Sequence, residues 1–231
     1  MIYDFREYIL HPGGTNDYME GVRELGLPIR QRHGVTLSGW YRSDIGALNQ
    51  VVHIWGYESL KHLNEAKAAV YADPDWAGKY LPRNRGLVES QKTYLMYSPS
   101  FAPVYPVHGE AEPGSEDAKK RNEMVYDFRK YTFTDEPDAV PKYMAAVEEV
   151  GLPIRKRHGV KLAGWFYSEI GDLPQVVHIW AFDNAQHLID AKAAVAADPD
   201  WSGKYVPRVS GLITAQNVSL MMSADFAPVP E

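Results

Sequence analysis

Apolar and polar residues alternate at the start of the chain, which predicts a β-strand with two different faces. Over residues 2–9, Asp4, Arg6 and Tyr8 share one face, and Tyr3 and Phe5 lie on the other. A helix is predicted next, over residues 16–32. Residues 35–43 and 50–58 are rich in β-branched and aromatic side chains and flank a glycine-bearing loop, so they form a predicted hairpin.

Apolar residues then recur at the spacing of an amphipathic helix. Leu60, Leu63, Ala66 and Val70 would share one face of a helix over residues 58–72. The sequence DPDW that follows predicts a second, short helical piece, because aspartate can cap a helix and proline suits its first position. The last strand is predicted over residues 87–97. The order strand, helix, strand, strand, helix, strand is that of a ferredoxin-like domain.

The chain contains this pattern twice. The segment YDFRKY from Tyr126 repeats YDFREY from Tyr3, and GLPIR from Gly151 repeats GLPIR from Gly26. The match continues through RHGV, QVVHIW, AKAAV, DPDW and GKY, and self-similarity of this length defines the folding unit. We therefore expect domains at residues 1–104 and 124–231. The linker between them, residues 105–123, is rich in Pro, Gly and charged residues that do not favour a packed structure.

Each predicted four-stranded sheet carries helices on one face only. Leaving the other apolar face in water is unfavourable by about 25 cal/mol per Å². We expect a second copy of the same unit to cover this face. The predicted fold class is therefore α+β, with two tandem ferredoxin-like βαββαβ domains whose antiparallel sheets form α/β-barrels, either within one chain or between chains.

Composition narrows the class of protein. Apolar residues make up 45% and charged residues 23% of the chain, as in ordinary globular proteins. No apolar run is long enough to span a bilayer and the start does not resemble a secretion signal, so we expect a cytoplasmic protein without a membrane span. A net charge of −6 argues against nucleic acid as a partner.

Familiar catalytic motifs are missing from the sequence. There is no cysteine, which excludes disulfides, thiolate metal sites and a cysteine nucleophile. No histidine pair has the i, i+4 spacing of a zinc site, and no nucleotide-binding or serine-hydrolase motif occurs. We therefore expect neither a metal nor a tightly bound cofactor.

Several segments resemble the NIPSNAP family. They are the first strand YDFREY, the helix end GLPIRQRHG, the hairpin IGALNQVVHIWGY, and YADPDW with its second copy AADPDW. The resemblance covers nearly all of both repeats and leaves out the linker. It implies membership of the dimeric α/β-barrel superfamily, in which two domains pack sheet to sheet around a cavity. That superfamily includes cofactor-free monooxygenases, lactone isomerases and haem-degrading enzymes, so analogy of fold selects no reaction.

One face of each predicted sheet gathers polar and aromatic side chains. We expect the aliphatic face of the third strand, with Val52 and Ile54, to pack under the helices, and the face with His53 and Trp55 to point into the barrel. His53 and His178 are the candidate catalytic residues. The candidate ligand-binding residues are Asp4, Arg6, Tyr8, Trp40 and Trp55, with their counterparts Asp127, Arg129, Tyr131, Trp165 and Trp180. Trp40 and Trp165 are included because, in a regularly alternating strand, they would lie on the opposite face from the preceding aliphatic residues, such as Leu37.

These residues support two functions from different classes. In the first, the barrel cavity binds a small apolar or aromatic molecule and an imidazole beside a carboxylate transfers protons without a cofactor. In the second, the same ion pairs and donors satisfy one another inside an interface, and the protein is a non-enzymatic oligomerisation or interaction module. Both include an intrachain pseudo-dimer, and both leave open a homo-oligomer of whole chains. The residues do not decide whether the protein is an enzyme.

Two further groups carry other chemistry. Basic residues end the first helix of each repeat and follow the DPDW turn, where they stabilise a helix dipole or capture a carboxylate or phosphate: Arg30, Arg32, His33, Arg83, Arg155, Arg157, His158 and Arg208. His62 and His187 lie early in the second helix of each repeat. Together with Trp55, His62 loosely resembles the haem site of haem-degrading relatives, although those proteins carry Asn in place of Asp4. A haem-binding or haem-degrading protein is the second alternative.

Overall fold

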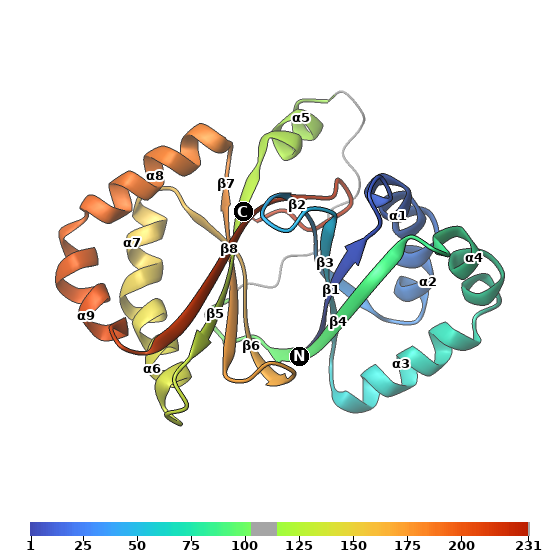
Figure 1. Ribbon diagram of the computed structural model, residues 1–231, viewed down its shortest axis with the longest axis horizontal. Helices are drawn as coiled ribbons and strands as arrows, with labels where there is room; N and C mark the ends of the chain where they lie inside the picture. The colour runs from blue at the N-terminus through green and yellow to red at the C-terminus, as the bar shows by residue number, and fades with distance from the viewer. Residues whose placement is uncertain (103–114, 231) are drawn as a thin grey trace.

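The computed structural model describes residues 1–102 and 115–230, which form a closed antiparallel barrel between two layers of helices (Figure 1). The strand order is β1-β3-β2-β8-β5-β7-β6-β4. The strands are β1 (Ile2–Leu10), β2 (Thr36–Ile45), β3 (Gln50–Tyr57), β4 (Val88–Tyr97), β5 (Val125–Phe133), β6 (Lys161–Ile170), β7 (Gln175–Phe182) and β8 (Ile213–Ser223). The predicted α+β fold class is therefore confirmed.

The two helical layers have the same composition. Helices α1 (Thr15–Gly21), α2 (Leu27–Arg32), α3 (Leu60–Ala72) and α4 (Leu81–Asn84) cover the first half, and α6 (Ala139–Ala146), α7 (Leu152–Arg157), α8 (Ala185–Ala197) and α9 (Val206–Val209) cover the second (Figure 1). A π-helical turn connects α1 to α2 (Val22–Gly26) and another precedes α4 (Trp76–Tyr80), with counterparts at Val147–Gly151 and Trp201–Tyr205. Leu63, Ala66 and Val70 are buried on α3, as the sequence pattern predicts, whereas Leu60, predicted on the same face, is 56% exposed.

Much of the predicted linker lies outside the described residues. Its end forms helix α5 (Glu116–Glu123), which the composition did not predict. The Ser115 hydroxyl caps this helix by accepting a 3.1 Å hydrogen bond from the backbone amide of Ala118. Helix α5 has no buried residue.

The barrel closes within one chain because strands of the two halves pair with each other. Strand β4 pairs with β6, with Tyr97 opposite Tyr167, and β2 pairs with β8, with Tyr41 opposite Ser223. The exposed sheet face of each half is thereby covered by the other half, as expected. The two halves form an intrachain pseudo-dimer.

The centre of the barrel is filled by side chains, and a cavity of about 310 Å³ remains at one end of it, lined by Glu7, Phe128 and Lys130 among others. All eight strands contribute to one buried cluster: Tyr3, Phe5, Tyr41, Val52, Ile54, Tyr94, Met96, Met124, Tyr126, Phe128, Ala163, Phe166, Val177, Ile179, Ala181 and Met221. Phe5 and Phe128, from equivalent positions of the two repeats, meet with ring centroids 6.2 Å apart. An eight-stranded barrel is just wide enough for its own side chains to fill it.

The predicted facing of the strands is therefore inverted. Val52 and Ile54 point into the barrel, whereas Trp55 and Tyr57 pack against the helices. A bulge in β2 between Leu37 and Gly39 also shifts the alternation, so that Trp40 lies on the same side as Leu37 instead of opposite it. A bulge inserts one unpaired residue and reverses the parity of every residue beyond it. The second half has the same bulge between Leu162 and Gly164.

The end of each half packs on the helical layer of the other half. Phe226, after β8, is 2% exposed within the first-half core and lies against Trp40 with a centroid distance of 5.7 Å. Phe101, after β4, lies 5.5 Å from Trp165 in the second-half core. This reciprocal exchange of segments links the two halves outside the barrel.

Candidate functional site

The polar and aromatic residues predicted from the sequence lie between the sheet and the helices. On β1, the Arg6 guanidinium donates to the Asp4 carboxylate at 2.7 Å and to the Tyr8 hydroxyl at 2.8 Å. Lys67 reaches Asp4 from α3 at 3.0 Å. Burial opposes ionisation of Asp4, but Arg6 and Lys67 outweigh it and hold the pKa of this carboxyl below its usual value. The row of Asp4, Arg6 and Tyr8 along β1, which we call the ladder, therefore carries paired charges.

The second half repeats this ladder. Arg129 donates to Asp127 at 2.8 Å and to the Tyr131 hydroxyl at 2.8 Å, and Lys192 of α8 lies 2.9 Å from Asp127. The structure therefore brings together, under each helical layer, the Asp, Arg and Tyr that the sequence analysis grouped on one strand face.

His53 is buried with a hydrogen-bond partner at each ring nitrogen. The indole Nε1 of Trp55 donates to His53 Nδ1 at 2.7 Å, and the Tyr18 hydroxyl lies 3.4 Å from Nε2. An indole N–H is only a donor, so Nδ1 accepts and the neutral ring carries its proton on Nε2. Burial, and then the charges of Arg6 and Arg30, hold the pKa of His53 well below 6.5. His53 is thus a neutral imidazole whose proton points at Tyr18.

His178 has the same environment in the second half. Trp180 Nε1 donates to its Nδ1 at 2.7 Å, and the Tyr143 hydroxyl lies 3.1 Å from its Nε2. Burial, then Arg129 and Arg155, hold its pKa well below 6.5. The catalytic role predicted for the two histidines stays a prediction.

Arg30 is a buried cation whose partners are aromatic rings. Its side chain, 7% exposed, lies 4.4 Å from the Trp55 centroid and 4.7 Å from the Trp76 centroid. Its Nη1 donates to the Gly26 carbonyl at 3.1 Å. No ion pair joins Arg30 to a carboxylate among the residues that the structure describes. Arg155 lies in the same way between Trp180 and Trp201.

A cavity of about 720 Å³ adjoins Arg30 under the first helical layer. We call it the first-half cavity. Three arginines and five aromatic residues line it together with five other residues: Arg6, Tyr8, Tyr18, Arg30, Tyr71, Trp76, Ala77, Tyr80, Leu81, Asn84, Arg85, Val88 and Gln91. None of these lining residues is acidic. Arg6 is paired with Asp4, so Arg30 and Arg85 give this cavity its positive charge in a chain of net charge −6.

The second-half cavity is smaller. It measures about 150 Å³ and lies nearer to α8, where Asp127, Arg129, Arg155 and Lys192 line it beside Trp180 and Trp201. One difference between the repeats is Tyr71, which stands where the second half has Ala196, and both residues line their cavity.

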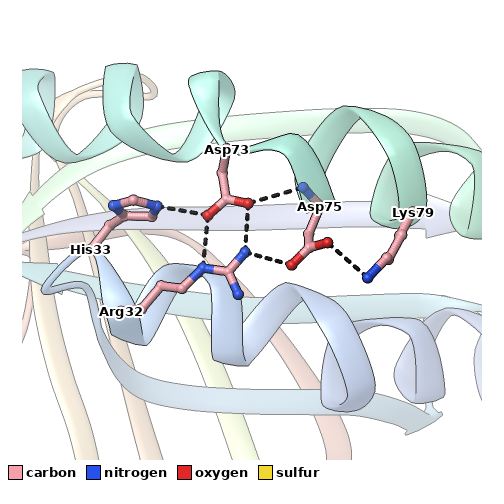
Figure 2. A network of polar contacts seen from close by, with 5 residues as sticks. All are labelled: Arg32, His33, Asp73, Asp75 and Lys79. Atoms are coloured by element: carbon pink, nitrogen blue, oxygen red, sulfur yellow. Dashed lines mark hydrogen bonds and ion pairs between the residues drawn. The ribbon is translucent and has the colours of Figure 1, made fainter.

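The remaining basic residues at the helix ends have structural partners. Arg32 Nε donates to Asp73 at 2.7 Å, His33 Nε2 lies 2.8 Å from Asp73, and the Asp75 amide donates to the same carboxylate at 3.0 Å (Figure 2). Hydrogen bonds from Arg32 hold the pKa of Asp73 well below its usual value. We call this network, with Lys79 paired to Asp75, the Asp73 clasp. It fastens the end of α2 to the end of α3, which accounts for the repeated DPDW motif.

The outcome for the predicted ligand-binding residues is mixed. Arg6 and Tyr8 line the first-half cavity, Trp55 lies directly behind Arg30, and Asp4 and Trp40 do not line it. Asp127, Arg129 and Trp180 line the second-half cavity, and Tyr131 and Trp165 do not.

Sequence reasoning missed several residues that line the first-half cavity, among them Tyr18, Trp76 and Tyr80. The repeated DPDW and GKY segments, which contain Trp76 and Tyr80, were the available signal. His62, considered for haem, lies at the start of α3, where its Nδ1 accepts from the Glu58 amide at 3.1 Å.

Two features that would define other classes of protein are absent from the described residues. No group of three or more His, Asp or Glu side chains among them is arranged to hold a metal ion. None of the helices in the described ranges is long and apolar enough to cross a membrane.

The architecture defines a class, the α/β-barrels assembled from two ferredoxin-like repeats. A model of the NIPSNAP family matches residues 3–103 and again residues 126–228. The chain therefore belongs to the NIPSNAP family, as the sequence motifs indicated.

The chain is also similar to curated relatives and to solved structures. The human protein NipSnap homolog 3A is 25% identical over 236 residues, which cover 99% of this chain and 86% of the human protein. A crystal structure of a NIPSNAP family protein with unknown function from Agrobacterium tumefaciens is 36% identical, covering 45% of this chain and 93% of that one, with a TM-score of 0.42. A putative monooxygenase from Lactobacillus acidophilus matches 100% of this chain and 98% of its own at 13% identity, with a TM-score of 0.64. That likeness shows a shared fold.

Proposed function

We propose that this protein binds a small aromatic or apolar anion in the first-half cavity. Arg30 is the observation that carries the proposal. A guanidinium is always charged, and a buried charge is unfavourable unless it is paired or hydrogen-bonded. Arg30 makes one hydrogen bond, to Gly26, and stacks on aromatic rings without a carboxylate partner in the described part of the chain. An anionic ligand group would supply that partner.

The lining supports the rest of the ligand description. Tyr8, Tyr18, Tyr71, Trp76 and Tyr80 offer flat apolar surfaces and hydroxyl groups. A volume of about 720 Å³ falls within the range of roughly 300–1,000 Å³ typical of small-molecule pockets. The second-half cavity, at about 150 Å³, falls below that range. We therefore assign ligand binding to the first half.

The predicted site residues take different roles in this proposal. Arg6 and Tyr8 would contact the ligand, and Trp55 would hold Arg30 in place. His53 does not line the cavity, but its Nε2 lies 3.4 Å from the hydroxyl of Tyr18, which does. His53 would therefore act as a positioning residue for Tyr18, and any proton transfer to the ligand would pass through the tyrosine hydroxyl.

The test uses the fluorescent anion anilinonaphthalenesulfonate, which combines fused aromatic rings with a sulfonate. It is titrated into the unmodified protein, Arg30→Met and Arg155→Met. Methionine keeps an unbranched apolar chain and removes the charge. Because the two arginines have matching aromatic partners, Arg155→Met controls for loss of a stacked cation elsewhere in the fold.

We expect Arg30→Met to weaken binding about tenfold or more, as the loss of a charge-assisted hydrogen bond does, and Arg155→Met to leave the affinity nearly unchanged. Equal effects of the two substitutions, or no effect of Arg30→Met, would contradict the proposal. Arg83→Met is a second control, because Arg83 is paired with Glu20 outside the cavity.

A further inference from the structure

Glu7 and Lys130 occupy equivalent positions in the two repeats, on β1 and β5, and carry opposite charges. They meet at the barrel interior, where Lys130 Nζ forms an ion pair with Glu7 Oε1. The Glu7 side chain is 8% exposed and that of Lys130 20% exposed. The pair therefore joins the two halves through two mostly buried side chains, beside the cavity at the end of the barrel.

Tyr94 of β4 completes the surroundings of this pair. Its hydroxyl, which has one proton to donate, lies 3.3 Å from Glu7 Oε2 and 3.4 Å from Asp172 Oδ2, and Lys130 Nζ lies 5.2 Å from the centroid of its ring. The aromatic face favours a cation and the hydroxyl favours an anion. Tyr94 of the first half is thus a second partner for both charges of the pair.

Three aromatic contacts across the middle of the barrel do not distinguish the two repeats. Phe5 faces Phe128, its own counterpart, and the contact of Tyr3 with Phe166 at 5.0 Å is mirrored by Tyr126 with Tyr41 at 5.1 Å. A barrel built from two first halves, or from two second halves, would retain aromatic contacts of the same kind. These contacts stabilise the packing of two sheets but do not select which repeat packs against which.

The position occupied by Glu7 in the first repeat and Lys130 in the second does distinguish the two repeats. Two first halves would bring Glu7 against a second Glu7, and two second halves would bring Lys130 against a second Lys130. Lys92, opposite Glu7 on β4, could offset part of the first repulsion, but Asn217 takes its place opposite Lys130. Like charges juxtaposed in a buried interface are strongly unfavourable.

We propose that the Glu7–Lys130 pair determines which sheet each half accepts: the barrel face of the first repeat is an interaction surface for the second repeat and rejects its own copy. Specificity of this kind needs a repulsive element as well as an attractive one. The arrangement prevents two chains from joining like half to like half, and it favours the closed barrel formed within one chain.

The test uses full-length chains with Glu7→Lys, with Lys130→Glu, and with both substitutions. Each single variant places like charges inside every barrel that it can form alone, so its thermal midpoint falls by several degrees. The double variant restores an opposite pair and returns to the midpoint of the unmodified protein. A double variant as unstable as the single ones would overturn the proposal.

Mixing tests the choice of partner directly. When the Glu7→Lys and Lys130→Glu chains are unfolded and refolded together, opposite charges are available only between chains. Native mass spectrometry should then show a one-to-one heterodimer. The matched control, Glu7→Lys refolded with the unmodified protein, should give separate chains, because the unmodified chain already contains its opposite pair. Separate chains in both mixtures, or heterodimers in both, would refute a role for this pair in partner choice.

Discussion

The guanidinium of Arg30 lies between two indole rings, 4.4 Å from the centroid of Trp55 and 4.7 Å from that of Trp76. The three residues come from α2, β3 and the π-helical turn before α4, so this one stack joins the sheet to α2 and to that turn. It places a cation at the wall of the first-half cavity without neutralising it. The recurrence of the stack around Arg155 explains why both repeats keep the GLPIR, VVHIW and DPDW segments together.

The stack should contribute to stability independently of any ligand. Arg30→Met removes cation–π contacts with two rings, each worth about 0.5–1 kcal/mol or more when desolvated, so we expect a loss of about 1–2 kcal/mol in the free energy of unfolding. Urea denaturation measures this loss. Arg155→Met should cost a similar amount, and a variant as stable as the unmodified protein would contradict the importance of the stack.

The sequence was sufficient to predict the repeat, the order of elements and the pairing of the two sheets. These features follow from strong local signals, such as the spacing of Leu63, Ala66 and Val70 on α3. The prediction of which strand face points into the barrel was wrong. Inward and outward positions of β3 are both wholly buried, Ile54 by the opposite sheet and Trp55 by the helices, so apolarity alone does not reveal which side is the barrel.

The Asp73 clasp should make stability depend on pH in the acid range. The folded pKa of Asp73 is depressed, first by hydrogen bonds from Arg32, so its contribution is present above the unfolded value of about 4 and is lost as pH falls through the folded pKa. We expect Asp73→Asn to lower the thermal midpoint by a few degrees at pH 7 and to reduce the fall in midpoint between about pH 4 and the acid limit of folding.

Asp75→Asn is the comparison for the clasp. The Asp75 carboxylate is 33% exposed and that of Asp73 6% exposed, so the same chemical change at Asp75 should have a smaller effect on the thermal midpoint. Equal midpoints for the two variants would show that burial of the Asp73 carboxylate is unimportant.

The exchanged segment that contains Phe226 should be a major source of stability. Its ring is 2% exposed against Trp40, and truncation of a buried phenylalanine to alanine typically costs about 3–5 kcal/mol. Phe226→Ala should therefore lower the urea midpoint strongly. Phe101→Ala should lower it less, because Phe101 is only partly buried. The reverse order of the two effects would contradict the packing described for the ends of the halves.

Neutral buried histidines predict a second pH dependence, nearer to neutrality. Burial holds the folded pKa of His53 and His178 well below 6.5, so the unfolded chain gains protons first as pH falls, and stability declines below about pH 6.5. Each histidine contributes a slope of up to about 1.4 kcal/mol per pH unit. Chemical denaturation from pH 7 to pH 5 measures it. The double variant His53→Gln, His178→Gln, in which an amide oxygen can still accept from the indole, should flatten the slope, and an unchanged slope would show that other groups cause it.

The cavity could not have been predicted from the repeat, because the two cavities occupy different places: Tyr18 and Asn84 line the first-half cavity, whereas Lys192 and Val195 of α8 line the second. Tyr71 and Ala196 occupy equivalent positions, yet the cavities that they line differ from about 720 to about 150 Å³. The position of Trp40 was equally inaccessible, since the bulge after Leu37 has no clear sequence signal beyond Gly39. Both features arise from packing between segments far apart in the chain.

The most direct test of ligand binding compares two probes that differ by one charged group. Phenylnaphthylamine has the rings of anilinonaphthalenesulfonate without the sulfonate, so the ratio of their dissociation constants isolates the contribution of the anion. The unmodified protein should bind the sulfonate about tenfold or more tightly than the neutral probe, and Arg30→Met should remove that preference. Equal affinities in the unmodified protein, or a preference that survives Arg30→Met, would contradict the assignment of the first-half cavity as an anion site.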